Sequence, residues 1–111
     1  MPPKTPNALL HGALEALILK TLVRGPRHGY AIARFIEDST REALLVEEGS
    51  LYPALYRMEQ KGWVEAEWGT SELGRRAKLY RLTPGGRAQL KSEMDAWRQF
   101  SAGVSKILFS E

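Results

Sequence analysis

Polar and charged side chains on one side of residues 50–61 could contact a nucleic acid. Ser50 and Tyr52 stand at the start of this segment, where the free N–H groups of a helix can donate hydrogen bonds to a phosphate oxygen. Arg57 lies further along, and its guanidinium can donate two hydrogen bonds to a guanine. The residues of this segment predicted to contact DNA are Ser50, Tyr52, Pro53, Arg57 and Lys61. If residues 50–61 are considered alone, the alternative is a solvated helix surface that binds no partner.

A block of positive charge follows in residues 73–92. The block has six basic side chains and no acidic one, although the whole chain has a net charge of only +3. Such a block indicates a polyanionic partner, or else a loop that keeps the protein in solution. We predict that Arg75, Arg76 and Lys78 reach the phosphate backbone or the minor groove of DNA.

Four helices are needed to position these residues. Apolar side chains recur with the helical period over residues 9–24, 30–40, 50–61 and from 84 onward. Ser50 is the predicted N-cap of the third helix, and Gly62 is its predicted left-handed end. Thr83 and Pro84 mark the start of the last helix as N-cap and first helical residue.

Two strands are predicted between the third and the last helix, over residues 63–68 and 78–83. Apolar and polar side chains alternate in both, and residues 69–77 would form a projecting loop between them. Arg81 is predicted to pair with Glu65 or Glu67 across this hairpin. The apolar run 44–46 would form a short strand or fill the core.

The predicted fold class is mainly α with a small β-hairpin, in the form of a winged helix-turn-helix followed by a long C-terminal dimerisation helix. Residues 1–83 would be the DNA-binding domain and residues 84–111 the dimerisation helix. The last helix would be about 37 Å long, which is too long for the core of so small a domain. Its apolar residues alternate four and three positions apart, as in a coiled coil. The residues predicted to join two copies are Leu10, Leu14, Leu90, Met94, Trp97, Phe100, Val104 and Leu108.

Four blocks of the sequence resemble the PadR-type transcriptional regulators. These blocks are His28-Gly29-Tyr30, the Gly-Ser-Leu-Tyr-Pro-Ala-Leu run at 49–55, Glu-Gln-Lys-Gly at 59–62, and residues 75–86. The resemblance spans about residues 9–108 and is closest to the short kind with one C-terminal helix. Trp63 departs from the usual leucine or isoleucine, which should affect packing only.

The resemblance implies a dimeric winged-helix repressor that a small molecule often releases from its promoter. It also implies that Tyr52 and its neighbours contact DNA, that the wing does so too, and that the last helix dimerises. Some relatives bind drugs against a tryptophan of this helix. Trp97 is therefore either plain interface packing or an aromatic wall for a flat hydrophobic effector.

The sequence offers no set of residues for chemistry other than binding. The absence of cysteine excludes disulfides, thiolate metal sites and cysteine nucleophiles, and it suits the cytoplasm. His11 and His28 have no further ligand at metal-binding spacing, and no catalytic constellation or cofactor motif is present. Glu15 and Lys20 interrupt the most apolar stretch, so no membrane span is expected.

The sequence thus predicts a homodimeric DNA-binding regulator without enzymatic activity, a cofactor or a metal. It would repress a nearby promoter through a pseudo-palindromic operator, and a small hydrophobic effector could release it. The alternative is a winged-helix module that docks another protein and does not read DNA. A neutral wing would be typical of that class, and Arg75 and Arg76 argue against it.

Overall fold

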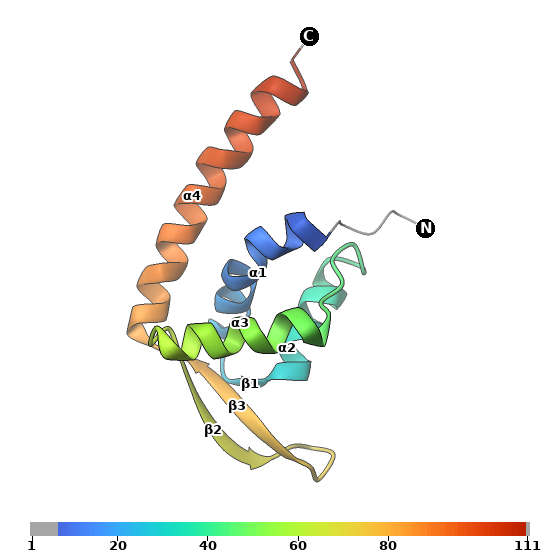
Figure 1. The fold of residues 1–111 in the computed structure, drawn as a ribbon, viewed down its shortest axis with the longest axis vertical. Helices are drawn as coiled ribbons and strands as arrows, with labels where there is room; N and C mark the ends of the chain where they lie inside the picture. The colour runs from blue at the N-terminus through green and yellow to red at the C-terminus, as the bar shows by residue number, and fades with distance from the viewer. Residues whose placement is uncertain (1–6, 111) are drawn as a thin grey trace.

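A computed structural model describes residues 7–110 of the chain, without the side chains of residues 7–9 and 11. Four helices and a three-stranded antiparallel sheet make up the fold (Figure 1), which confirms the predicted fold class. The His11 side chain lies outside the described residues. The elements in chain order are α1 (Asn7–Leu22), β1 (Arg27–His28), α2 (Gly29–Ser39), α3 (Glu48–Gln60), β2 (Val64–Thr70), β3 (Arg76–Leu82) and α4 (Pro84–Leu108).

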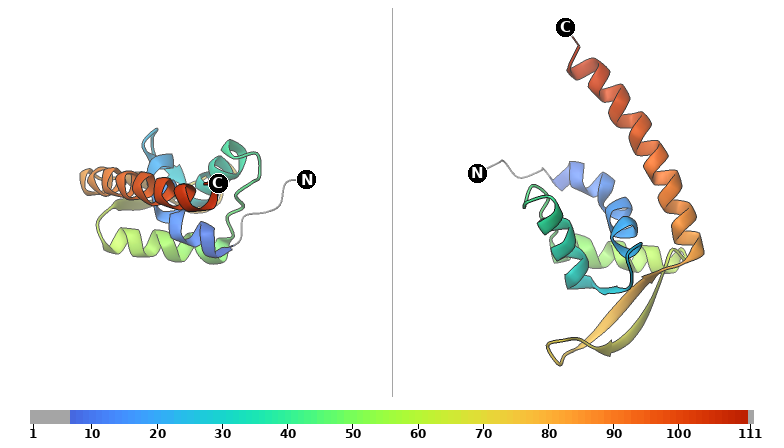
Figure 2. Two further views of the ribbon diagram at one scale, coloured as in Figure 1. Left: turned by 90° about the horizontal axis from the view of Figure 1, so that it is seen from above. Right: turned by 180° about the vertical axis from the view of Figure 1, so that it is seen from behind.

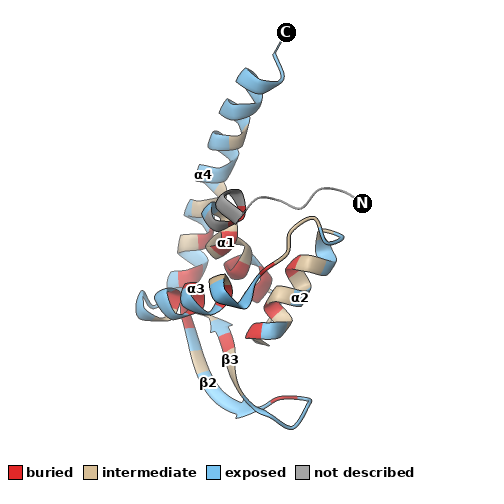
Figure 3. Cartoon of the chain, turned by 45° about the vertical axis from the view of Figure 1, so that its right-hand side comes forward, coloured by how far each residue is buried: buried red, intermediate tan, exposed pale blue. Residues whose placement is uncertain are grey.

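The core lies where α1, α2 and α3 meet the start of the hairpin and the first turns of α4. The apolar stripes expected from the helical period are the residues that pack there (Figure 3). The two-residue strand β1 pairs with β3 and completes the sheet in the order β1-β3-β2. The fully buried side chains of the core include Leu14, Ile18, Leu19, Leu22, Ile32, Leu51, Leu55, Met58 and Val64.

The third helix begins two residues earlier than predicted. Its N-cap is Glu47, so the prediction of Ser50 as the cap is wrong; Ser50 lies in the first turn, and its N–H donates to the Glu47 carbonyl at 3.0 Å. Pro53 therefore falls in the second turn and removes a donor to the carbonyl of Gly49. Both residues are exposed, so water can satisfy that carbonyl.

The segment before α3 is irregular, and the run 44–46 fills the core without forming a strand. Val46 is buried, and its N–H donates to Glu37 Oε2 at 3.0 Å. Arg41 and Glu42 both have a positive φ in the turn that precedes it. The polar backbone of this buried stretch is thus satisfied by a side chain of α2 instead of a sheet partner.

The hairpin is longer and its loop shorter than predicted. Thr70 pairs with Arg76, so the loop is residues 71–75 and Arg76 belongs to β3. Ser71 and Arg75 close it, since the Ser71 N–H donates to the Arg75 carbonyl at 2.8 Å, and Gly74 supplies the positive φ of 75° that the turn requires. The alternation of side chains therefore continues to the wing tip.

The start of α4 is held by a dense set of contacts, as the Thr-Pro pair predicted. The Thr83 side chain accepts a hydrogen bond from the Gly86 N–H at 2.9 Å and lies 2.6 Å from the carbonyl oxygen of Gly62, to which it donates. A Cβ on Gly86 would overlap the carbonyl oxygen of Trp63. Glycine is thus required here because α4 passes directly over the end of α3.

Beyond Met94, α4 leaves the rest of the chain and extends away from the end that carries the hairpin (Figures 1 and 2). Most residues of this outer part are exposed, including the aromatic side chains of Trp97 and Phe100. None of the helices within residues 7–110 is long and apolar enough to cross a membrane.

We expect Gly86→Ala to lower the free energy of unfolding by about 1–3 kcal/mol, because the new methyl group must displace backbone of residue 63. Urea denaturation at one fixed protein concentration measures the change. Gly85→Ala is the matched control, since its nearest neighbour would be at an ordinary 3.5 Å. Equal stability of the two variants would contradict the close approach.

Candidate nucleic-acid interface

One groove of about 420 Å³ separates α3 from the wing formed by β2 and β3. Its walls come from the start of α2, one side of α3 and one face of the hairpin. Aromatic rings dominate the lining: His28, Tyr30, Tyr52, Tyr56, Trp68 and Tyr80. The groove therefore offers flat apolar surfaces with polar edges between two elements that the sequence predicted to contact DNA.

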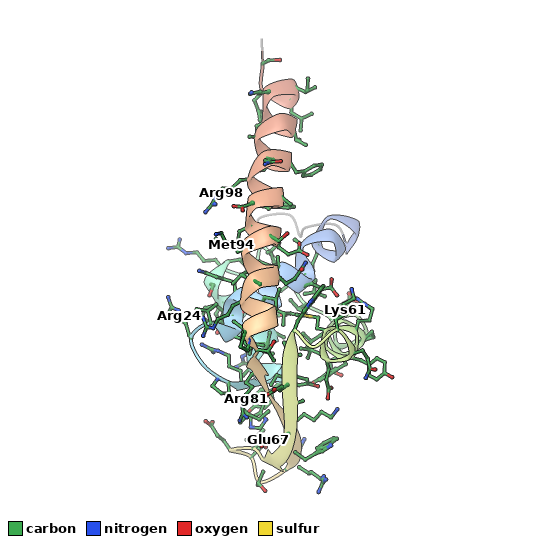
Figure 4. The ribbon with its side chains drawn as sticks, turned by 90° about the vertical axis from the view of Figure 1, so that its left-hand side faces the viewer. Arg24, Lys61, Glu67, Arg81, Met94 and Arg98 are labelled. Carbon is green, nitrogen blue, oxygen red and sulfur yellow. The ribbon has the colours of Figure 1, made fainter. Side chains whose placement is uncertain are left out.

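The strand register decides which charged residues of the wing face this groove. Trp68 pairs with Lys78 and Thr70 with Arg76, so these cations share a face with Trp68. Arg81 lies on the other face, where its guanidinium meets Glu67 Oε1 at 3.1 Å (Figure 4). The predicted cross-strand ion pair of Arg81 is confirmed.

Tyr52 is positioned by a glycine at the start of α2. A Cβ on Gly29 would lie 2.7 Å from Cε1 and 3.0 Å from the hydroxyl of Tyr52, so the ring rests against bare backbone. Burial, and then the negative charge of Glu48, raise the pKa of the Tyr52 phenol above its ordinary value. The phenol stays neutral at physiological pH and can donate a hydrogen bond to an oxygen in the groove.

His28, the residue before Gly29, makes two contacts at the start of α2. Its Nδ1 lies 3.0 Å from the carbonyl oxygen of Lys78, and its ring stacks on Tyr30 at 5.9 Å between centroids. This residue therefore joins the start of α2 to β3 beside the groove. The described residues contain no group of three or more potential metal ligands, and His28 is held by hydrogen bonding and stacking.

The predicted DNA-contact residues of α3 do not all project in the same direction. At 100° per residue, the arc opposite the buried side contains Gly49, Pro53, Tyr56 and Gln60, all of them exposed. Tyr52 lies on the groove side of this arc. Ser50, Arg57 and Lys61 lie on its far side, and Arg57 Nε is 3.8 Å from Glu15 Oε2 of α1.

Tyr56 was not among the predicted DNA contacts, although it lines the groove and is 63% exposed in the middle of α3. Its spacing of three residues from Pro53 and four from Tyr52 was the available signal. Trp68 lies on the face of the hairpin that Lys78 shares, and more than half of the residue is exposed.

Most predicted DNA-contact cations have a partner within the chain. Lys78 Nζ lies 3.4 Å from Glu59 Oε1 and 5.5 Å from the centre of the Trp68 ring. Arg76 covers the same ring at 4.9 Å, and Lys61 lies 4.5 Å from the ring of Trp63. Arg75 extends from the exposed wing tip.

The residues predicted to join two copies fall into two groups. Leu10, Leu14 and Leu90 are buried within the chain's own core, and Met94 is partly buried against it. The outer members are exposed, and Trp97 packs against Phe100 with 6.0 Å between ring centroids. The exposed members of the seam are Trp97, Phe100, Val104 and Leu108, extended by Ile107 and Phe109.

A three-helix core with a β-hairpin wing and an exposed third helix defines a winged helix-turn-helix protein. The model of the transcriptional regulator PadR-like family matches residues 18–92, and the chain belongs to this family.

Curated relatives and solved structures agree with this assignment. The chain is 31% identical over 91 residues to the uncharacterized protein X of Lysinibacillus sphaericus, covering 82% of this chain and 84% of that one. It is 34% identical over 68 residues to the transcriptional regulator Rv3488 of Mycobacterium tuberculosis, covering 61% and 63% of the two chains.

Among solved structures, a transcriptional regulator from Clostridium thermocellum superposes with a TM-score of 0.84 at 28% identity and covers 92% and 99% of the two chains. A PadR-like regulator from Bacillus cereus has a TM-score of 0.78 at 30% identity, with 95% and 100% covered.

We expect Gly29→Ala to destabilise the chain by about 1–2 kcal/mol, because the added methyl group pushes the Tyr52 ring away from α2. In a Tyr52→Ala background the same change should be neutral or slightly stabilising, since the ring is gone. Urea denaturation of the four proteins measures both steps. A cost that persists without the ring would contradict the contact.

Proposed function

We propose that this PadR-family protein is a homodimeric repressor that binds a pseudo-palindromic operator near a promoter. The observation that carries the proposal is the placement of the outward arc of α3 beside the cation-bearing face of the wing, across one groove. In such an arrangement α3 enters a major groove while the wing follows the adjacent backbone. The predicted contacts are Ser50, Tyr52, Pro53, Arg57, Lys61, Arg75, Arg76 and Lys78, to which Tyr56 is added.

The dimer is supported by the outer half of α4. Trp97 and Ile107 are 52% and 78% exposed, and they belong to a run of apolar side chains with no cover from the described part of the chain. A second copy of the same helix is the partner that such a seam favours. Residues 84–111 would then be the dimerisation helix, and residues 1–83 the part that reads DNA.

Two-fold symmetry in the protein requires matching symmetry in the operator. Each copy would present one α3, so the half-sites would lie about one helical turn of DNA apart. A flat hydrophobic effector against Trp97 would act by changing the distance or angle between the two α3 helices. We place the protein in the cytoplasm, where it would meet its promoter.

The function is tested by fluorescence anisotropy with two labelled duplexes of equal length. One carries an inverted repeat from the DNA upstream of the protein's own gene, and the other has a random sequence. We expect the repeat to bind at least about 10³-fold more tightly, and both affinities to fall steeply with salt. Equal affinities for the two duplexes that do not change with salt would contradict the DNA-reading function and favour a protein-docking module.

The dimer is tested by sedimentation at micromolar concentration, where we expect twice the 12.5 kDa mass of one chain. Val104→Glu should give monomers, because it places a charge within the apolar seam. Lys106→Glu is the matched control, since Lys106 lies on the opposite side of α4 from Trp97. A monomeric wild type, or equal effects of both variants, would contradict the seam.

A further inference from the structure

The α3–wing groove contains an acidic residue where a DNA-binding surface would be expected to be purely cationic. Glu59 lies on α3, on the groove side of the helix, seven residues after Tyr52. Its carboxylate oxygen Oε1 is 3.4 Å from Lys78 Nζ, and both side chains are about 30% exposed. Glu59 therefore places a negative charge between α3 and the wing.

Lys78 makes this pair together with a contact to Trp68. Its ammonium group lies 3.4 Å from the Glu59 carboxylate and 5.5 Å from the centre of the Trp68 ring. Trp68 is itself covered by Arg76, so the lysine has little freedom to turn toward the outside without losing two contacts. The ion pair thus fixes the position of one of the predicted phosphate contacts.

The surroundings of the Glu59 carboxylate are those that a phosphate oxygen would favour. An ammonium group lies beside it, and the Tyr80 side chain is nearby and almost fully buried. Burial raises the pKa of Tyr80, and the charge of Glu59 and the neighbouring Tyr52 raise it further, so Glu59 acts electrostatically on this phenol. Carboxylate and phosphate oxygens accept hydrogen bonds from the same donors.

The acidic residues of strand β2 do not share this position. Glu67 pairs with Arg81 on the opposite face, and Glu65 lies on that same face according to the strand register. They would remain in place when DNA enters the groove side. Among the described acidic residues, Glu59 is the one whose carboxylate forms an ion pair with Lys78.

We propose that Glu59 competes with a DNA phosphate for Lys78, and that the ion pair must open when the wing engages the backbone. This inference rests on the proposed DNA-binding function and assigns a new affinity-determining residue to it. Because a phosphate contact is independent of base sequence, Glu59 weakens binding to every duplex by a similar factor. Retention on the operator then depends more strongly on the base contacts of α3.

The test is Glu59→Gln, which keeps the shape of the side chain and removes its charge. We expect affinity for the operator and for random duplex to rise about two- to fivefold, the range that a partly exposed ion pair provides. The slope of log K against log salt should also steepen by up to about one unit. The reason is that wild-type Glu59 takes up a cation when Lys78 leaves it, which offsets one counterion released from DNA.

Two further variants separate this mechanism from a general charge effect. Glu65→Gln removes the same charge from the opposite face and should change affinity by less than about 1.5-fold at physiological salt. In a Lys78→Gln background, Glu59→Gln should raise affinity less than it does in the wild type, because only the repulsion between the carboxylate and the phosphates remains. An effect of Glu59→Gln that is equally large without Lys78, that is matched by Glu65→Gln, or that is absent would overturn the proposal.

The failure of this inference can be told from the failure of the proposed function. The ratio of operator to random affinity in the wild type tests whether the protein reads DNA. The ratio of variant to wild-type affinity on one duplex tests Glu59. If the wild type prefers its operator and Glu59→Gln leaves the affinity unchanged, the proposed competition is wrong. The proposed repressor function would not be affected by that result.

Discussion

The relative orientation of α3, the wing and α4 depends on one junction formed by Gly62, Trp63, Thr83 and Gly86, of which Thr83 and Gly86 are buried. The Thr83 hydroxyl lies 2.6 Å from the Gly62 carbonyl and 3.0 Å from that of Trp63, and the Thr83 N–H donates to Trp63 at 3.2 Å. Gly86 passes so close to Trp63 that no side chain fits. Since α3 ends, the wing begins and α4 starts within these residues, the three elements are constrained to move together.

The groove beside this junction is built from contacts between residues far apart in the sequence. The Tyr52 ring rests on Gly29, His28 reaches the Lys78 carbonyl, and Glu59 meets the Lys78 ammonium. The two contacts of Lys78 join residues that are 50 and 19 positions apart. Arg76 and Lys78 of the wing are consequently held by the Trp68 ring and, for Lys78, by a carboxylate, and under the proposed function DNA binding would exchange these partners for phosphate oxygens.

Local patterns predicted most of the fold, because helical period, strand alternation and the Thr83-Pro84 start depend on neighbours in sequence. They did not predict β1, since two residues carry no period, nor the true start of α3, where Glu47 precedes the helix without a side-chain cap. Of the cations predicted from type and spacing, Arg76 and Lys78 line the groove. The ion pairs of the basic residues were not found, except that of Arg81, because only the register and the packing of α3 against the wing decide which acid each base meets.

The burial of the predicted seam bears on how any signal would travel from α4 to DNA. Leu90 belongs to the chain's core, whereas Trp97 and the residues beyond it are exposed, so α4 is anchored at its first turns and free along the rest. A rigid helix anchored in this way acts as a lever, and a small change of angle in the outer part must appear at its base. At that base Gly86 touches Trp63, directly after α3, so a rotation of α4 in a dimer would be passed to α3 without an intervening flexible loop. In the proposed dimer, a ligand held at Trp97 would therefore alter the spacing of the two α3 helices without entering the groove between α3 and the wing.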